Sequence, residues 1–292
     1  MKKRYFEESE LILNPDGSIY HLHLMPEQVA DNIIVVGDPG RVSMVSKYFD
    51  TIEFQIQNRE LVTHTGMLNG KRVSAISTGM GTDNIDIVLN ELDALANINL
   101  KTREEKEEHR TLNIIRIGTS GSLQGDVPVD SFVMATHGLG LDGLMNFYKV
   151  DENVFDREMA EAFIKHSKWL PELPKPYIVS CSSFLEQKIG EGMVKGITAT
   201  ACGFFGPQGR VLRLNVADPQ LNDKLESFNY KGHRITNFEM ETSALYGLGK
   251  AMGHNTLTVC VTIANRVTKT YSSDYKKVVD KLVQIVLQRL TS

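Results

Sequence analysis

The sequence predicts a layered α/β fold with a largely parallel or mixed sheet. Short runs of apolar, β-branched residues alternate along the chain with segments of helical periodicity, which is typical of layered α/β proteins. Several apolar runs are nearly continuous, and this indicates strands buried on both faces of the sheet. The chain shows no internal repeat and no low-complexity linker, so residues 1–292 are expected to form one domain.

The predicted strands are short, apolar and rich in β-branched residues. In chain order they are residues 33–36, 73–77, 113–117, 132–136, 177–181 and 256–263, with 197–201 as a further candidate.

The predicted helices are longer segments with apolar residues at helical spacing. In chain order they are residues 41–50, 84–98, 156–167, 218–227, 240–252 and 273–290. In the last of them, the apolar pattern runs from Val278 to Leu290, and Ser273 and Asp274 supply an N-cap and an acidic first turn.

Composition excludes several classes of function. The net charge of −4 gives no basic field for nucleic acid or an anionic membrane, and no apolar run is long enough to span a bilayer. The N-terminus has no apolar segment typical of a secretion signal. Cys181, Cys202 and Cys260 lie far apart in the sequence, so we expect free thiols in the cytoplasm and no zinc site. The charged run 101–110 is expected to be a solvated helical extension or loop.

Two glycine turns follow predicted strands. Residues 37–41 (GDPGR) lie between a strand and a helix, where glycine lets backbone N–H groups approach an anion and Arg41 adds a forked donor. The plain alternative is a connecting turn with a surface arginine. Residues 77–82 (STGMGT) form a similar turn. Turns at several strand ends indicate a crevice at the carboxyl edge of the sheet.

Arg116 lies inside an apolar strand and is followed by residues 118–122 (GTSGS), which predict a third turn. This segment matches neither a Walker loop nor a G-x-G-x-x-G fingerprint. An arginine inside an apolar strand is costly unless an anion meets it. The sequence leaves both partners open for Arg116, a protein carboxylate or a ligand phosphate.

Two later segments carry polar groups suited to a small polar ligand. Glu239 and Glu241 flank Met240 at the start of a predicted helix, where they could accept hydrogen bonds from sugar hydroxyls or serve as an acidic first turn. The loop 203–210 (GFFGPQGR) offers an aromatic face and, at Gln208 and Arg210, the donors and acceptor to read the edge of a ring such as uracil. A structural turn is the plain alternative for this loop.

Taken together and in their order along the chain, the five segments resemble the nucleoside phosphorylase family, which includes uridine phosphorylases and the hexameric purine nucleoside phosphorylases. The resemblance runs from about Tyr20 to the C-terminal helix. It implies a single-domain, three-layer α/β/α fold with a central mixed, partly barrel-like sheet of the phosphorylase/hydrolase-like kind. It also implies a pentosyltransferase that uses inorganic phosphate as co-substrate and needs no cofactor.

The resemblance implies a role for each matching residue. The phosphate site would comprise Gly37, Arg41, Arg116 and Thr119, with Arg59 supplied by a neighbouring subunit. The ribose contacts would be Thr119, Glu239, Met240 and Glu241, with His21 supplied by the neighbour. The active unit would then be a dimer or a hexamer. The residues implied in catalysis are Arg116, Gln208, Arg210 and Glu241.

The base end distinguishes the subclasses of the family. Uridine phosphorylases would hold uracil at the positions of Phe204, Gln208, Arg210 and Ile263. Purine-specific relatives use an aspartate that matches Ala264, next to Asn265, so a pyrimidine is favoured. The expected reaction is reversible phosphorolysis of uridine to uracil and ribose 1-phosphate in pyrimidine salvage, with deoxyuridine or thymidine as further substrates. A purine nucleoside phosphorylase, a phosphate-independent nucleosidase and a non-catalytic nucleoside-binding protein stay open as alternatives.

The chain departs from the family pattern at three places. It carries an N-terminal extension at 1–20 and a charged insertion at 101–112. Some relatives hold a monovalent cation with a glutamate that matches Glu60 and a serine. Asn84 stands at the serine position, so a cation near Glu60 stays an open question, and no other metal is expected.

Overall fold

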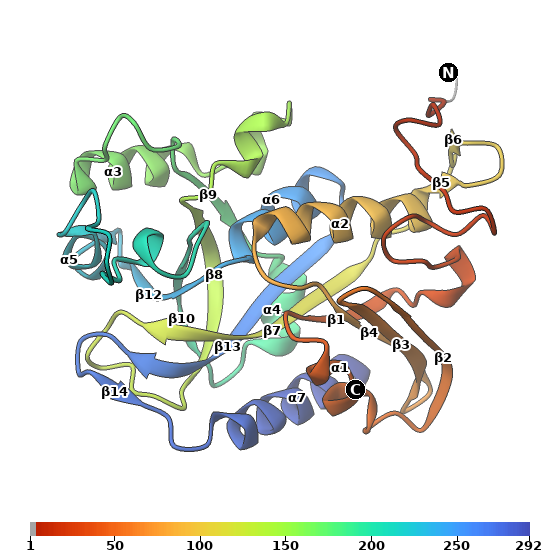
Figure 1. The fold of residues 1–292 in the computed structure, drawn as a ribbon. Helices are drawn as coiled ribbons and strands as arrows, with labels where there is room; N and C mark the ends of the chain where they lie inside the picture. The colour runs from red at the N-terminus through yellow and green to blue at the C-terminus, as the bar shows by residue number, and fades with distance from the viewer. Residues whose placement is uncertain (1–3) are drawn as a thin grey trace.

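The computed structural model describes residues 4–292, and its centre is one mixed sheet of twelve strands (Figure 1). These strands are β1 (Asn32–Val36), β2 (Thr51–Asn58), β3 (Leu61–Leu68), β4 (Lys71–Ser77), β7 (Asn113–Ser122), β8 (Phe132–Gly140), β9 (Tyr177–Ser180), β10 (Val194–Thr200), β11 (Asn229–Tyr230), β12 (His233–Glu239), β13 (Asn255–Asn265) and β14 (Thr270–Tyr271). A separate small sheet pairs β5 (Ile98–Asn99) with β6 (Glu104–Glu105).

Seven α-helices connect and cover the strands. They are α1 (Gly40–Ser46), α2 (Thr82–Asn97), α3 (Arg157–Ser167), α4 (Ser183–Ile189), α5 (Leu221–Glu226), α6 (Thr242–Ala251) and α7 (Tyr275–Thr291), all within residues 4–292. Short 3-10 helices form at η1 (Pro26–Gln28), η2 (Leu144–Phe147), η3 (Glu152–Val154) and η4 (Gly206–Gln208).

Part of the sheet closes into a barrel. The main strand order is β11-β12-β10-β8-β13-β7-β1-β4-β3-β2, and β12 also pairs with β7. This extra antiparallel pairing places Phe238 opposite Gly121 and joins β12, β10, β8, β13 and β7 into a closed ring. Parallel and antiparallel pairs are mixed around the ring. The mixed, partly barrel-like sheet implied by the resemblance is therefore confirmed.

Helices cover both faces of the sheet and make three layers. Successive residues of a strand point to opposite faces, and β1 shows this directly. Ile33 and Val35 belong to the core under α2 and α6, whereas Ile34 and Val36 belong to the core over α1 and α7. Figure 1 shows the two helix pairs on opposite sides of the strands. A third apolar cluster lies under α3 and α5.

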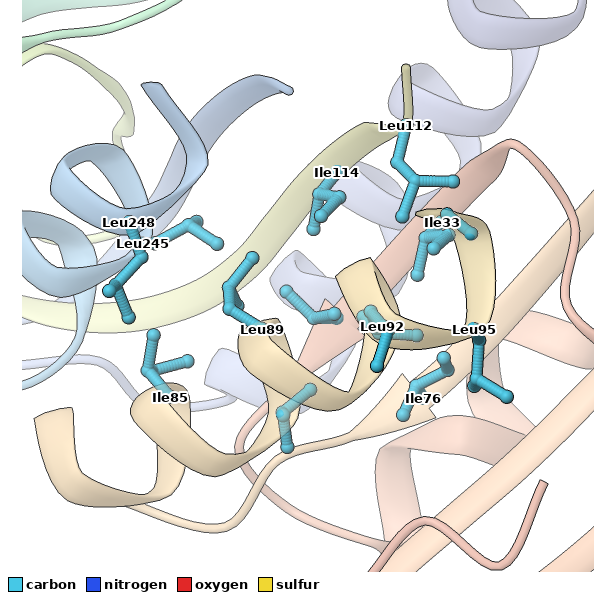
Figure 2. Packing of buried hydrophobic residues seen from close by; sticks show 14 of the residues in the cluster. Ile33, Ile76, Ile85, Leu89, Leu92, Leu95, Leu112, Ile114, Leu245 and Leu248 are labelled. Atoms are coloured by element: carbon cyan, nitrogen blue, oxygen red, sulfur yellow. The ribbon is translucent and has the colours of Figure 1, made fainter. Parts of the chain in front are cut away.

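The contact between α2 and the sheet is made of interlocking aliphatic side chains. Figure 2 shows residues of α2, α6, β1, β4 and β7 converging in this layer. Ile85, Leu89 and Leu92 of α2 are fully buried there. They lie at the i, i+4, i+7 spacing of one helical face, so the apolar periodicity of this segment fixes which side of α2 meets the strands.

The predicted strands are all present, but some elements differ from the prediction. The third glycine turn is wrong, because β7 continues through Ser122 while it pairs with β13 and β12. The hairpin β2–β3, strand β12 and helix α4 were not predicted. The helix predicted at 240–252 begins only at Thr242, after the strand that ends at Glu239. At α7 the N-cap is Asp274, which accepts from the Lys277 N–H, and not Ser273.

The extension and the charged insertion contact one another. Tyr5 and Glu104 form an isolated β-bridge, and Phe6 N–H donates to the carbonyl of Arg103 at 2.9 Å. Residues 101–105 form turns and the two-residue strand β6, so the loop alternative is confirmed for this part of the run. Leu11 and Ile19 of the extension are buried in the core under α2. The first three residues of the extension lie outside the described residues. Within residues 4–292, no helix has both the length and the hydropathy to cross a bilayer.

Replacing Leu89 by alanine should lower the free energy of unfolding by about 2–5 kcal/mol, because Leu89 is fully buried and its truncation opens a cavity. Leu214→Ala is the matched control: this leucine is 85% exposed, and its loss should change stability by less than about 0.5 kcal/mol. Urea unfolding of both variants measures the difference, and equal losses would contradict the packing described for α2.

Candidate active site

A cleft of about 770 Å³ opens where β1, β4, β7, β12 and β13 end or lead into loops. Its lining includes every site residue that the sequence assigned to the chain's own cleft. The residues predicted for an anion are Gly37, Arg41, Arg116 and Thr119. Those predicted for a sugar and a base are Glu239, Met240, Glu241, Phe204, Gln208, Arg210 and Ile263. Gly37 and Ile263, 226 positions apart in the sequence (263 − 37), thus meet in one cleft.

The floor of the cleft holds a buried ion cluster. Nη1 of Arg116 lies 3.0 Å from Oε2 of Glu239, and Nη2 donates to Oε2 of Glu241. The side chains of all three residues are almost fully buried. Burial disfavours the charge of Arg116, but the carboxylates of Glu241 and Glu239 outweigh it and raise the pKa of the guanidinium. Arg116 therefore has its carboxylate partners within the chain.

Gly118 gives the Arg116 side chain its space. The two residues lie on the same side of β7, and a Cβ at position 118 would stand 2.3 Å from Nη1 of Arg116. Because no side chain fits there, glycine is required for the arginine to fold back along the strand. The glycine that predicted a turn is thus needed by a neighbour's side chain and not by the backbone.

Two guanidinium groups keep donors that no protein atom uses. Nη1 of Arg41 and Nε of Arg116 are buried and have no hydrogen-bond partner among the described residues. Among the described residues, the one ion pair of Arg41 is with Asp38, with Nε and Oδ2 3.9 Å apart. Burial and the charge of Arg116 both lower the pKa of Arg41. Buried donors without partners are costly, so an anion bound at this end of the cleft would stabilise both arginines.

Glu241 ties the ion cluster to the glycine turn after β4. Its Oε1 accepts from the N–H of Gly81 at 2.8 Å, and Gly81 has a φ of +98° that favours glycine. The neighbouring Gly79 also has a positive φ, and a Cβ there would collide with the side chain of Asn84. The turn predicted at 77–82 is confirmed, and its geometry holds a carboxylate at the cleft.

The opposite end of the cleft is lined by an amide and an arginine, Gln208 and Arg210. Gln208 is buried, and its Oε1 accepts from Nη1 of Arg210 at 2.6 Å. The guanidinium of Arg210 lies over the ring of Phe204, 3.8 Å from its centre. The sequence predicted that Phe204 covers a ligand ring, and here Arg210 covers one face of Phe204.

Arg266 is a functional candidate that the sequence analysis missed. Its Nη2 donates to the backbone carbonyl of Gln208 at 3.2 Å. Burial lowers the pKa of Arg210, and the nearby charge of Arg266 lowers it further. Within residues 4–292 neither arginine forms an ion pair, so this end of the cleft has uncompensated positive charge. An arginine directly after the last central strand was the available signal.

The late strand supplies no acid to this end. Ala264 lines the cleft, whereas Asn265 is buried away from a ligand role. The Asn265 amide donates to the carbonyls of Gln124 and Val127, and its oxygen accepts from the N–H groups of Val267 and Thr268. All of its hydrogen-bonding capacity goes into holding the loop.

His21 and Arg59 do not line the cleft of their own chain. Arg59 is exposed in the tight turn between β2 and β3, with a φ of +54°. Asn58 in the same hairpin donates from Nδ2 to the carbonyl of His21 at 2.9 Å. Glu91 accepts from Nδ1 and from the backbone N–H of His21. The two residues thus occupy one surface region, and their supply to a neighbour's cleft stays a prediction.

Two places in the described part of the chain bring potential cation ligands together. Glu60 and Asn84 both line the cleft, and a cation there stays an open prediction. Elsewhere, Asp93, His109 and His254 bring potential ligand atoms within 4.8 Å of one another. However, Nδ1 of His254 accepts from the Leu112 N–H, so the proton is assigned to Nε2, which donates to Asp93. A metal at Nε2 would require the proton to move to Nδ1, which already faces the Leu112 N–H. His109 stacks on His254 with 5.6 Å between ring centres and pairs its Nε2 with the Met252 carbonyl. Hydrogen bonding and ring stacking therefore account for these residues without a metal.

Known proteins are similar to this chain in sequence and in fold. The sequence model of the family described as Phosphorylase superfamily matches residues 31–291. A uridine phosphorylase from Thermococcus kodakarensis is 28% identical over 280 residues, which cover 93% of this chain and 86% of that protein. A DeoD-type purine nucleoside phosphorylase from Listeria welshimeri is 26% identical over 249 residues, 85% of this chain and 87% of the relative.

A solved structure is similar over nearly the whole chain. The crystal structure of a Trypanosoma brucei nucleoside phosphorylase, described as showing uridine phosphorylase activity, superposes with a TM-score of 0.85 at 29% identity. The match covers 96% of this chain and 99% of that one. The family match spans most of the chain and includes all residues that line the cleft, so the protein belongs to the phosphorylase superfamily.

Proposed function

We propose that the protein is a uridine phosphorylase, which cleaves uridine with inorganic phosphate to give uracil and ribose 1-phosphate. The observation that carries the proposal is the polarity of the cleft. One end has buried arginine donors without partners, and the other has the amide of Gln208 and the guanidinium of Arg210, with Arg266 bonded to the Gln208 backbone beside them. The uridine phosphorylases among the similar proteins support the choice of substrate.

The anion end would hold the phosphate. Arg41, Arg116 and Thr119 line this part of the cleft, beside Gly37. Much of the charge of Arg116 is balanced by Glu239 and Glu241, so Arg41 supplies the larger share of the attraction. We propose that Arg59 of a neighbouring subunit adds a further cation, because the cleft of one chain has only these two arginines at its anion end.

The sugar would lie over the ion cluster, between phosphate and base. Phosphate is a weak nucleophile, so the glycosidic bond breaks largely before the new bond forms, and positive charge develops on the ribose. The bound anion below C1′ stabilises that charge and then bonds to the carbon. Glu241 and Met240, with His21 from the neighbour, would fix the ribose so that C1′ faces the phosphate. The reaction needs neither a covalent enzyme intermediate nor an organic cofactor.

The base end would stabilise the leaving group. Uracil departs with its electron pair and becomes negative, and donors held in place before the reaction stabilise that charge. Gln208 and Arg210 are the donors, and the Arg266 charge nearby acts in the same direction. Ile263 and Phe204 supply apolar surface to this end. No group has to change its protonation state for the base to leave.

The alternatives fit the cleft less well. Purine phosphorylase relatives exist at similar identity, but Ala264 and the fully bonded Asn265 leave the late strand without an acid for a purine. A nucleosidase would have no use for a partnerless arginine at the anion end. A non-catalytic nucleoside-binding protein would not need donors at both ends.

The proposal predicts that the protein releases uracil from uridine only when inorganic phosphate is present. A panel of uridine, deoxyuridine, thymidine, inosine and adenosine, each with and without phosphate, checks this by chromatography of the free base. Base release without phosphate would indicate a nucleosidase, and cleavage of inosine but not uridine would contradict the pyrimidine assignment.

Replacing Gln208 or Arg210 by alanine should lower kcat for uridine on the order of 100- to 1000-fold, because each removes a donor to the departing base. The KM for phosphate should change little, since the anion lies at the other end of the cleft. Arg213→Ala in the same loop is the matched control, because Arg213 is exposed and does not line the cleft. Near-normal uridine turnover in both variants would refute the base-end assignment.

Sharing of the site predicts rescue between two inactive variants. In a mixed dimer of Arg59→Ala and Arg41→Ala subunits, one cleft has both arginines intact. Co-expression should restore about one quarter of the wild-type activity, since random pairing makes half of the dimers hybrid and each hybrid has one complete site. Arg41→Ala mixed with Gln208→Ala should show no rescue, because both residues act in their own chain. Absence of rescue in the first mixture would contradict a shared site.

A further inference from the structure

The two glutamates at the end of β12 differ in the hydrogen-bonding capacity that they have left. An ionised carboxylate offers about four acceptor positions. Oε1 of Glu239 accepts from Oγ1 of Thr200 at 2.7 Å, and the Thr242 N–H is shared between Oε1 at 3.1 Å and Oε2 at 3.0 Å. Oε2 also accepts from Glu241 N–H at 2.9 Å and forms an ion pair with Nη1 of Arg116 at 3.0 Å. Four protein groups thus face this carboxylate, as many as its acceptor positions.

Glu241 keeps room for a ligand. Its Oε1 accepts only from Gly81 N–H, and its Oε2 only from Nη2 of Arg116, among the described residues. Two acceptor positions are therefore open. A ribose presents two neighbouring hydroxyl donors, and this number matches the capacity of Glu241 alone.

The partners of Glu239 connect the two halves of the cleft. Arg116 belongs to the anion end, whereas the N–H groups of Glu241 and Thr242 belong to the turn that leads into α6 and carries Met240. Burial raises the pKa of Glu239, and the charge of Arg116 opposes that shift. A carboxylate at this depth holds both segments in one arrangement.

We propose that Glu239 is a positioning residue that touches no substrate: it orients Arg116 for the phosphate and holds the turn that presents Glu241 to the ribose. This inference rests on the proposed function of the cleft. It differs from the ribose contact that the family resemblance implies for Glu239, and it leaves Glu241 as the carboxylate that receives the sugar hydroxyls.

Substrates that lack one hydroxyl separate the two roles. Glu239→Gln places an NH₂ group among donors and removes the charge that holds Arg116. We expect it to raise the KM for phosphate about tenfold or more and to lower kcat/KM for uridine, 2′-deoxyuridine and 3′-deoxyuridine by the same factor, within about twofold. Glu241→Gln, the matched variant, should reduce kcat/KM unequally among the three. If Glu239→Gln affects uridine at least about tenfold more than either deoxy substrate, Glu239 contacts the ribose and the proposal is wrong.

Two variants of Thr200 test the same proposal if Glu239→Gln does not fold. Oγ1 of Thr200 donates to Oε1 of Glu239, and Thr200 does not line the cleft. Thr200→Val should raise the KM for phosphate in the same direction, and Thr200→Ser, which keeps the hydroxyl, should restore it. An unchanged phosphate KM in Thr200→Val, with uridine binding weakened instead, would overturn the proposal.

The test is separable from the substrate assignment. If the wild type cleaves inosine and not uridine, the same comparison uses inosine and its two deoxy forms. If the wild type cleaves none of them, calorimetric titration with inorganic phosphate decides: weaker binding in Glu239→Gln supports the proposal, and wild-type binding overturns it.

Discussion

The buried pairing of Arg116 with Glu239 and Glu241 is the constraint on which the cleft depends. A charge on a central strand is stable only where opposite charges meet it, and here the partners come from the junction of β12 and α6. That junction is fixed because β12 also pairs with β7 and closes the barrel. The closed sheet thus brings an arginine and two glutamates, more than 120 residues apart in sequence, into one cluster.

The cluster separates two positively charged ends of the cleft. It holds one positive and two negative charges. Arg41 at one end has a 3.9 Å contact with Asp38 and a buried donor without a partner, and Arg210 and Arg266 at the other end form no ion pair among the described residues. Positive ends separated by a carboxylate-rich middle match a reaction in which the sugar becomes positive between phosphate and a departing anionic base. The cleft is thus arranged for the charges of the transition state rather than for those of the nucleoside.

Sequence patterns predicted most of the central strands, though not β12, because apolar β-branched runs carry strong local signals. Together with the family resemblance, they selected residues that the structure gathers in one cleft. They missed β2, whose residues are mostly exposed, and β3, whose apolar residues are interrupted by the polar segment 63–65. They also misread residues 118–122 as a turn. There, pairing with β13 overrides the local preference of glycine, and Gly118 serves Arg116 instead. No sequence pattern could show which of Glu239 and Glu241 keeps free acceptor positions. Nor could the pattern of one chain show whether His21 and Arg59 reach the cleft of a neighbour.

The most direct measurement is a crystal structure of the protein with phosphate and uracil bound. The account predicts an anion within hydrogen-bonding distance of both Arg41 and Arg116, with Arg59 of an adjoining subunit beside it and the uracil edge on Gln208 and Arg210. An anion bound elsewhere, with Arg116 contacting only Glu239 and Glu241, would contradict it.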